Sequence, residues 1–316
     1  MKIIGTGHAL PKLVVTNDML AEFLDTSDEW IRTRTGIQER RLLSDETLDQ
    51  IAEQAMKNAL DDAGISAKDL DFIICSNVAN NMVTPGFGCL LQGRIGATCP
   101  TIDINCACTG FIYALNMANA FFKAYDYKNI LIVCAEQPSR YCNWKERDTS
   151  ILFADGAAAV VVNNSENNML GFHLNNECDI EPLYYCRRLE PTPFNKVEEA
   201  NHPLKMQGKA VYKIAIQSST NDIIQVLKKT NIKIEDVDYF VLHQANERII
   251  KSICRNLGQP IEKFPMNIAH LGNTSSASVP ILLDVLCKEN TFKEGDIIVF
   301  SAFGGGFTTG ACIYKW

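Results

Sequence analysis

The fold is indicated by the stretch NILIVCA at residues 129–135, because a stretch of the same kind, DIIVFSA, returns at residues 296–302. A second pair lies at the same offset, DLDFII at residues 69–74 and DVDYFV at residues 236–241. Self-similarity at a fixed offset is typical of chains built from repeated structural units. The sequence therefore predicts two halves built on one plan.

Each predicted half, residues 1–165 and residues 166–316, alternates helical and apolar segments. A helical pattern from Ile51 to Ala63, or from Ile216 to Lys229, leads into an apolar strand, another helix and a second apolar strand. Apolar runs with little polar alternation are typical of strands buried on both faces, so we expect a layered α/β fold with helices covering the sheets. Residues 163–206, rich in Asn, Glu and Pro, are predicted to be an irregular connection.

Composition argues against several classes of protein. The chain has 316 residues, 47% of them hydrophobic, which is enough to bury a large core. Its apolar runs are far shorter than the roughly 20 residues that span a bilayer, and no leader segment is recognisable, so we expect a cytoplasmic protein with no membrane partner. The net charge of −7 disfavours nucleic acid as a partner. The 12 Cys form no CxxC pair, which favours a reducing compartment over zinc or disulfides.

Cys108 is the candidate nucleophile. It lies where a short strand-like run, residues 101–105, gives way to a helical pattern that begins at Phe111. A thiol at the first turn of a helix faces unpaired N–H groups and the positive end of the helix dipole, and both favour the thiolate. Cys106 is the rival nucleophile, but we expect it to be a small packing residue before the turn.

Three further segments carry groups that acyl transfer requires. An apolar strand at residues 239–242 delivers His243 at its end, where catalytic side chains tend to emerge in α/β proteins. A small polar turn contains Asn273, and three glycines at residues 304–306 let the backbone approach a ligand closely. Together with Cys108 they supply a nucleophile, two hydrogen-bonding side chains and a backbone oxyanion donor, the minimum for acyl transfer through a thioester.

This set of motifs resembles the thiolase superfamily, and within it the β-ketoacyl-acyl-carrier-protein synthase III enzymes that start fatty-acid synthesis. The likeness runs along the whole chain, through residues 4–7, 25–31, 34–37, 101–111, 153–157, 241–249, 272–275 and 302–307. It implies a thiolase-like fold of five layers, α-β-α-β-α, a homodimer, and neither a metal nor a redox cofactor. It also implies that Cys108, His243 and Asn273 form the catalytic triad.

The reaction that the resemblance implies is a decarboxylative Claisen condensation. Cys108 attacks an acyl-CoA, and the backbone N–H groups of Cys108 and Gly305 hold the oxyanion; one such donor is typically worth about 3 kcal/mol. Malonyl-acyl-carrier-protein then loses CO₂, and His243 Nε2 and the Asn273 amide stabilise the enolate. Attack of the carbanion on the acyl-enzyme gives β-ketoacyl-acyl-carrier-protein.

The resemblance also implies a coenzyme A site. Trp30 and Arg147 match positions that sandwich the adenine between an indole and a guanidinium. Arg34 matches an arginine on the pantetheine and phosphate side. Gly208 matches the wall along which the pantetheine arm passes, and Asn246 is assigned to the same site.

Thr84 is a departure from the family that bears on substrate choice. Before Pro85, well-known members carry an aromatic residue that reaches into the acyl pocket of the partner subunit. The smaller Thr84 leaves room for longer or branched acyl groups, unless another side chain such as Phe87 refills the pocket. The sequence leaves these alternatives open.

A basic face is the candidate docking site for the acidic acyl carrier protein. Arg248, Lys251 and Arg255 fall at i, i+3 and i+7 on the helix that follows the predicted catalytic histidine, opposite an apolar stripe. Lys209 and Lys213 stand four residues apart on the preceding helical segment. A charge stripe is often only a solvated face. Here its position beside the active-site histidine favours docking.

Three other functions compete for the same residues. A degradative thiolase would carry a second Cys in the glycine turn at residues 303–307, which has none. A specialised acyltransferase of polyketide or quinolone-type biosynthesis would keep Cys108 and most motifs, and Thr84 is compatible with it. A thiol redox sensor could pair Cys108 with Cys106, but one intervening residue would strain that disulfide, and His243 would have no role.

Overall fold

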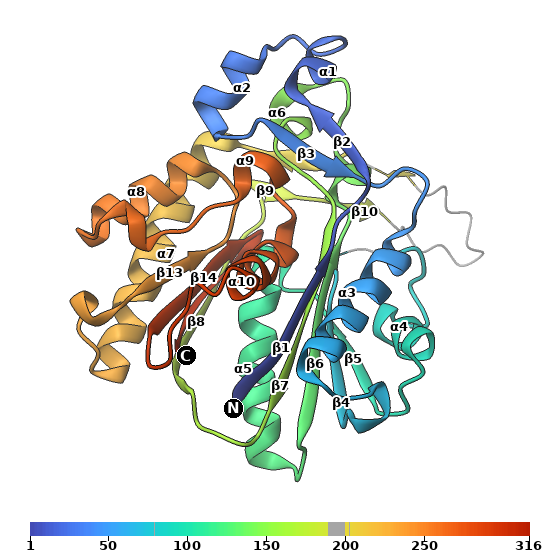
Figure 1. Cartoon of the computed structure of the whole chain (residues 1–316). Helices are drawn as coiled ribbons and strands as arrows, with labels where there is room; N and C mark the ends of the chain where they lie inside the picture. The colour runs from blue at the N-terminus through green and yellow to red at the C-terminus, as the bar shows by residue number, and fades with distance from the viewer. Residues whose placement is uncertain (79, 189–199, 202) are drawn as a thin grey trace.

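The chain contains two large sheets, and four strands of the first have the same order as the four strands of the second (Figure 1). The computed structural model describes residues 1–78, 80–188, 200–201 and 203–316. The N-terminal sheet has the order β1-β7-β6-β4-β5 and the C-terminal sheet the order β8-β15-β14-β13. The first consists of β1 (Lys2–Ala9), β4 (Phe72–Ser76), β5 (Thr101–Ile104), β6 (Asn129–Glu136) and β7 (Gly156–Asn163). The second consists of β8 (Met169–Asp179), β13 (Tyr239–Leu242), β14 (Ile297–Gly304) and β15 (Gly306–Lys315).

The pairing within the sheets repeats as well. β1 and β6 are antiparallel to β7, while β4 is parallel to β6. In the C-terminal sheet β8 and β14 are antiparallel to β15, while β13 is parallel to β14. The two copies of the repeated stretch thus become β6 and β14, which hold equivalent places. The predicted duplication is confirmed, and so are the two predicted helices, as α3 (Leu48–Ala63) and α7 (Gly208–Thr230).

Five layers follow from strands that are buried on both faces. Along β6, residues 130, 132 and 134 pack into a core between the sheets, which also contains α5 (Gly110–Ala124) and α10 (Ser278–Lys288). The alternate residues 131, 133 and 135 pack against α3 and α4 (Phe87–Ile95) on the outer face. An equivalent outer core joins the C-terminal sheet to α7 and α8 (Glu247–Leu257). Figure 1 shows α5 between the two sheets.

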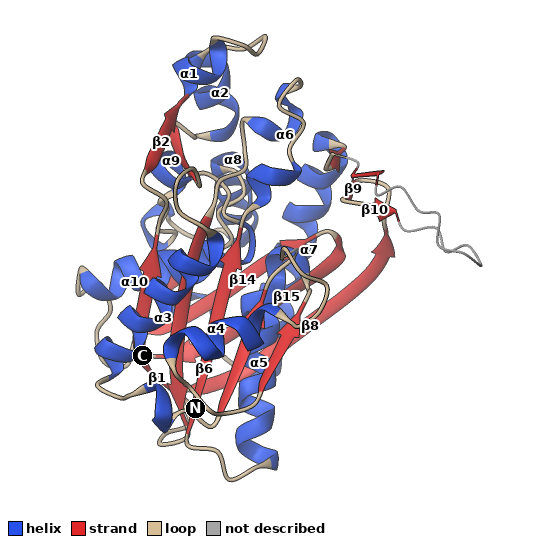
Figure 2. Cartoon of the chain, turned by 90° about the vertical axis from the view of Figure 1, so that its right-hand side faces the viewer, coloured by secondary structure: helices blue, strands red, loops and turns tan. Residues whose placement is uncertain are grey.

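A cluster of short elements covers one end of the sheets, at the top of Figure 2. It contains β2 (Leu13–Thr16), α1 (Asn17–Ala21), α2 (Asp28–Thr35), β3 (Glu39–Leu42), α6 (Arg147–Ser150) and α9 (Ile268–Leu271). Arg40 of β3 is fully buried within this cluster, and its guanidinium group donates to the carbonyls of Val15 and Ile151 and to Asn17 Oδ1. This arginine therefore ties the N-terminal β2–α1 segment to the α6 segment. Among the described residues, no helix combines the length and apolarity that crossing a membrane requires.

The prediction for residues 163–206 is wrong in part, because the 11-residue strand β8 lies within this segment and forms the edge of the C-terminal sheet. An edge strand has one unpaired side, and every β8 residue except Met169 is partly buried or exposed, so β8 lacks the continuous apolar pattern of the inner strands. Short pairs follow: β9 (Leu183–Tyr184) with β12 (Lys205–Met206), and β10 (Arg187–Arg188) with β11 (Ala200–Asn201). Residues 189–199 and 202 lie outside the described residues. We propose the boundary between the halves at residues 165 and 166, in the link between β7 and β8.

Candidate active site

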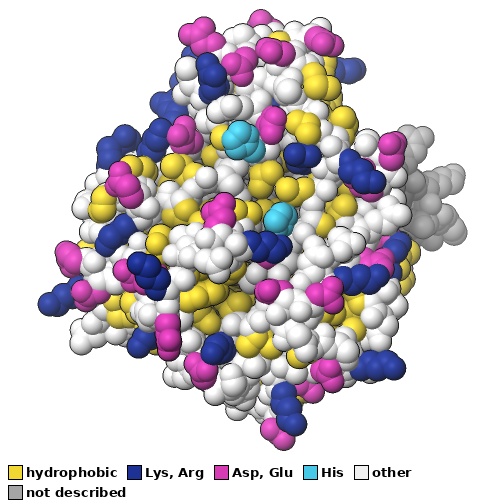
Figure 3. All heavy atoms as spheres, in the orientation of Figure 1, with side chains coloured by type: hydrophobic (Ala, Val, Ile, Leu, Met, Phe, Trp, Pro, Cys, Tyr) yellow, Lys and Arg dark blue, Asp and Glu magenta, His cyan; other side chains and the backbone are white. Residues whose placement is uncertain are grey.

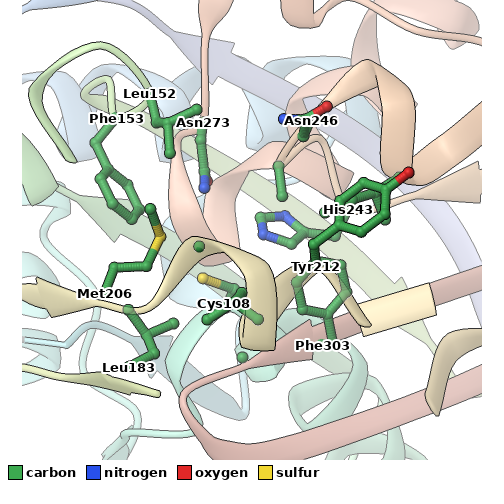
Figure 4. Close-up of a pocket in the computed structure, with 15 residues that line it drawn as sticks. Cys108, Leu152, Phe153, Leu183, Met206, Tyr212, His243, Asn246, Asn273 and Phe303 are labelled. Carbon is green, nitrogen blue, oxygen red and sulfur yellow. The ribbon is translucent and has the colours of Figure 1, made fainter. Parts of the chain in front are cut away.

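Two cavities meet at Cys108. We call the first the histidine cavity, because His243 and Asn273 line it together with Tyr212, Asn246 and Gly208; its volume is about 110 Å³ (Figure 4). The second, the glutamate cavity, has a volume of about 280 Å³ and is lined by Glu136, Tyr141, Tyr184, Tyr185, Leu204 and Gly305, among others. Cys108, Phe153 and Leu183 line both. The two cavities therefore adjoin at Cys108, and this residue can be approached from either one.

The geometry separates the two candidate thiols. Cys108 belongs to a 3-10 turn, Ala107–Thr109, between β5 and α5. Cys106 lines neither cavity, and its carbonyl oxygen accepts the Thr308 hydroxyl at 2.8 Å. The structure therefore places Cys108, and not Cys106, on the walls of the two cavities.

The expectation that helix position makes Cys108 a thiolate is wrong for the unliganded site. Burial raises the pKa of Cys108 to about 12, and the nearby Glu136 carboxylate acts in the same direction. The Ser275 hydroxyl, with Oγ 3.4 Å from Cys108 Sγ, lowers it only partly. Because α5 begins at Gly110, Cys108 precedes the helix, and loss of solvent outweighs the favourable dipole. The thiol is protonated at neutral pH and must lose its proton during acyl transfer.

His243 follows β13 directly, as predicted, and its imidazole is buried. Its Nδ1 lies 2.6 Å from Ser278 Oγ, which also accepts the backbone N–H of Gln244 at 3.3 Å. The Gln244 N–H occupies one lone pair of Ser278 Oγ and leaves its hydroxyl proton able to donate to Nδ1; in that arrangement the neutral imidazole carries its own proton on Nε2. Burial lowers the pKa of His243 to about 3, so the ring is neutral at neutral pH.

Asn273 is held by both its backbone and its side chain. Its backbone N–H donates to Leu152 O, its carbonyl accepts Ala154 N–H, and its Oδ1 accepts Ser275 N–H at 2.9 Å. Since the oxygen end of the amide is engaged, the NH₂ end is left to face the histidine cavity, as Figure 4 shows. Asn273 thus offers a hydrogen-bond donor and not an acceptor to a ligand.

The glycine turn after β14 lies against the backbone of the nucleophile. A Cβ atom on Gly304 would stand 2.6 Å from the Cys108 amide nitrogen, a distance that no side chain tolerates. Gly305 lines the glutamate cavity, where a Cβ would lie 3.1 Å from Leu183 O. Glycine at position 304 lets two backbone segments from different halves of the chain meet at the Cys108 amide.

Three site residues were not anticipated from the sequence: Glu136, Ser275 and Ser278. Glu136 carried a signal, because it is a charged residue directly after the apolar stretch of β6. Ser275 and Ser278 belong to the same polar turn as Asn273, and serine in a turn is by itself no sign of a functional role. Among the described residues, no three His, Cys, Asp or Glu side chains cluster in a way that could hold a metal ion.

Trp30 and Arg34 lie four residues apart on α2, and Arg147, at the start of α6, comes to the same place from a distant part of the sequence. Both guanidinium carbons lie over the Trp30 ring, Arg34 at 4.3 Å and Arg147 at 4.4 Å from its centroid. Arg147 also binds the carbonyl and carboxylate of Asp25. The predicted adenine sandwich is therefore closed in this state, since no base fits between Trp30 and Arg147 until the arginine moves.

Gly208 and Asn246, the two residues expected along the coenzyme A arm, line the histidine cavity. A Cβ on Gly208 would meet nothing closer than Met206 Cε at 4.0 Å, so that wall is open. Asn246 caps α8, because its Oδ1 accepts Arg248 N–H at 2.8 Å, and its Nδ2 donates to Arg34 O at 3.1 Å. Its amide thus joins α8 to α2, and one of its N–H groups stays available to a ligand.

Phe87, the alternative residue for the acyl pocket, lines neither cavity of its own chain. Its side chain is only 5% exposed and packs in the core between α4 and the N-terminal sheet. Its backbone N–H donates to the Asp103 carboxylate, which fixes the start of α4. Thr84 is exposed and lines neither cavity of its own chain.

The predicted basic face lies at the surface of α7 and α8, and its members are exposed: Lys209, Lys213, Arg248, Lys251 and Arg255. Acidic side chains stand among the Lys and Arg side chains on the left of Figure 3, over α8. On α8 the Glu247 carboxylate pairs with the Lys251 ammonium group at 2.7 Å. The guanidinium carbon of Arg248 lies 5.9 Å from the ring centroid of Tyr212, which lines the histidine cavity. The face therefore borders that cavity.

Proteins similar to this chain match it over its whole length. The family described as 3-oxoacyl-[acyl-carrier-protein (ACP)] synthase III matches residues 102–178, and its C-terminal part matches residues 227–316. A β-ketoacyl-[acyl-carrier-protein] synthase III of Clostridium perfringens is 42% identical, over 99% of this chain and 98% of its own. The crystal structure of the Aquifex aeolicus synthase III is 41% identical, covers 100% of this chain and 99% of its own, and has a TM-score of 0.92. For the Thermus thermophilus synthase III the identity is 33%, the coverage 100% and 99%, and the TM-score 0.93.

Proposed function

Since the chain belongs to the β-ketoacyl-[acyl-carrier-protein] synthase III family, we propose how its own residues carry out the reaction of that family. It is an acyltransferase that performs the condensation initiating fatty-acid synthesis. Relatives of that name, 42% and 41% identical over nearly the whole chain, favour this activity over a specialised polyketide or quinolone-type synthase. The observation that carries the proposal is the convergence of Cys108, His243 and Asn273 on one cavity.

The first half-reaction transfers an acyl group to Cys108. Its sulfur attacks the thioester carbonyl of an acyl-CoA, and the coenzyme A thiol leaves. The backbone N–H groups of Cys108 and Gly305 hold the oxygen that becomes negative. The close approach of the glycine turn to the Cys108 backbone supports this pairing of donors.

The second half-reaction uses the two donors of the histidine cavity. Malonyl-acyl-carrier-protein loses CO₂, and the enolate oxygen that forms is stabilised by His243 Nε2–H and by the Asn273 NH₂ group. Two observations support these roles: the Ser278 hydroxyl favours the required imidazole tautomer, and Ser275 N–H engages the Asn273 oxygen. Neutral donors in a buried site stabilise charge that appears only during the reaction.

Coenzyme A would lie along Gly208 and Asn246, with its adenine between Trp30 and Arg147 and with Arg34 on the pantetheine and phosphate side. The Arg147 side chain would leave the Trp30 ring to admit the base. We further propose that the protein works as a cytoplasmic homodimer without a bound cofactor, and that its partner is an acyl carrier protein.

A direct assay tests this function. The purified protein, acetyl-CoA and malonyl-acyl-carrier-protein should together yield coenzyme A, CO₂ and acetoacetyl-acyl-carrier-protein, which is detected by intact mass. Omission of acetyl-CoA should leave only slow decarboxylation. Hydrolysis of acetyl-CoA without carbon–carbon bond formation would contradict the proposal.

The exposed Thr84 leads to a prediction about primer length. In the proposed dimer this residue would face the partner's acyl pocket, and each additional buried methylene of substrate contributes about 0.8 kcal/mol if the vacated space is empty. The wild type should therefore accept butyryl- or branched acyl-CoA at least as well as acetyl-CoA, and Thr84→Phe should shift the preference to acetyl. Mass spectrometry after exposure to a panel of acyl-CoAs measures both. Thr84→Val, in which the side chain has nearly the same size, is the control. If the wild type is strictly acetyl-specific and Thr84→Phe behaves in the same way, Thr84 does not set the chain length.

Charge reversal on α8 tests carrier-protein docking. Lys251→Glu combined with Arg255→Glu should raise the KM for malonyl-acyl-carrier-protein by about tenfold, because like charges would then face an acidic partner. Self-acylation by acetyl-CoA should be unchanged. Lys228→Glu, on an exposed part of α7 remote from the face, serves as the control. An equal effect of the control, or no effect of the double variant, would place docking elsewhere.

A further inference from the structure

Glu136 is a buried ionisable group that the reaction as described above does not use. It is the last residue of β6 and is 1% exposed. Its carboxylate nevertheless lines the glutamate cavity, in which Cys108 also lies. A carboxylate is costly to bury beside a nucleophile unless it is paired or serves the chemistry.

Hydrogen bonds hold the Glu136 carboxylate from two sides. Oε1 accepts the Ser276 hydroxyl at 2.6 Å, and Oε2 accepts the Val78 backbone N–H at 3.2 Å. The Ser276 oxygen in turn accepts the Ser76 hydroxyl at 3.0 Å. Within the described part of the chain, these hydrogen bonds fix the carboxylate in place and no salt bridge joins it to a cation.

Ser275 connects this carboxylate to the nucleophile. Its Oγ lies 3.4 Å from Cys108 Sγ. Ser275 lines the glutamate cavity together with Glu136 and Cys108, and its side chain acts to lower the pKa of both groups, so one hydroxyl lies in position to serve both. A hydroxyl that can donate and accept at once is a suitable carrier for a proton between a thiol and a carboxylate.

The groups that face Glu136 carry no charge at neutral pH. They are Cys75 on β4, Cys134 on β6, Cys108 itself and Tyr141 in the 3-10 turn η3 (Pro138–Tyr141), and each has a raised pKa. Burial among them raises the pKa of Glu136 to about 7. A carboxyl group poised near neutrality can both take up and return a proton. His243, whose pKa burial lowers to about 3, holds a proton poorly.

We propose that the Glu136 carboxylate accepts the proton of the Cys108 thiol through the Ser275 hydroxyl while the acyl group moves from coenzyme A to the sulfur. This inference rests on the role proposed above for Cys108. The S–H bond breaks, Ser275 Oγ takes that proton, and the hydroxyl proton passes to Glu136. The sulfur bonds to the acyl carbon, the carbon–sulfur bond to coenzyme A breaks, and the departing thiolate recovers a proton from Glu136. A thiol and a thioester thus give a thioester and a thiol, and Glu136 returns to its ionised form.

The pH dependence of single-turnover acylation by acetyl-CoA tests the relay. Since Glu136 must be ionised to accept a proton, the wild-type rate should rise with pH through an inflection near 7 and then level off. Glu136→Gln should lower the rate by about 10²-fold and remove the inflection. Ser275→Gly, which suits the positive φ of 54° at that residue, should do the same, while Glu136→Asp should keep an inflection.

Two controls separate this relay from other causes. Asp284→Asn removes another buried carboxylate, one that lines neither cavity, and should leave both rate and profile unchanged. A second buried carboxyl, Asp155, also lines neither cavity, and burial raises its pKa to about 6. If the inflection persists in Glu136→Gln, it arises from another group such as Asp155, and the relay is overturned. If Glu136→Gln does not fold, an unchanged profile in Ser275→Gly would equally overturn it. Mass spectrometry of the wild type distinguishes the two proposals, because acylation away from Cys108 would refute the role of Cys108 itself.

Discussion

The Cys108→Ala variant should form no acyl-enzyme when it is mixed with acetyl-CoA. Cys108 carries the only sulfur that reaches both described cavities, and alanine leaves no nucleophile at their junction. Intact-protein mass spectrometry measures the result directly: the wild type should gain one acetyl group and the variant none. Condensation with malonyl-acyl-carrier-protein should fall to the background rate for the same reason.

Cys106→Ala is the matched control for this experiment, because the same residue type lies two positions away. It should be acylated as the wild type is, since its sulfur lines neither cavity and its backbone carbonyl, which binds Thr308, is kept. Acylation that survives in Cys108→Ala and disappears in Cys106→Ala would reverse the assignment.

The His243→Ala and Asn273→Ala variants should each lose malonyl decarboxylation by about 10²-fold or more, and lose acylation much less. Both residues present neutral donors to the histidine cavity, where the enolate charge would develop. Carbon dioxide release from malonyl-acyl-carrier-protein measures the first half of this prediction. Single-turnover acylation by acetyl-CoA measures the second.

His270→Ala is the control for the histidine variant, because His270 has a side chain that is 67% exposed and lines neither cavity. It should keep both half-reactions. Equal losses of decarboxylation and acylation in His243→Ala would instead make His243 the obligatory base for the thiol. That result would also leave no need for a proton acceptor at Glu136.

The fold could be predicted from the sequence because its signal is local and repeated. Strands β6 and β14 are apolar on both faces, which only a sheet covered by helices on each side can satisfy, and they recur at one offset. Strand β8 escaped prediction for the converse reason. It lies at the edge of its sheet, so partial exposure permits polar residues and hides the strand pattern.

The sequence by itself also determined the types of reactive side chain and their places at strand ends and turns, as for Cys108, His243 and Asn273. Only the tertiary structure decided their chemical state. The protonation of Cys108, the tautomer of His243 and the closure of Trp30 depend on partners distant in the sequence: Ser275, Ser278 and Arg147. Desolvation and hydrogen bonding act through space over a few ångströms, and only the folded chain brings these partners within that range.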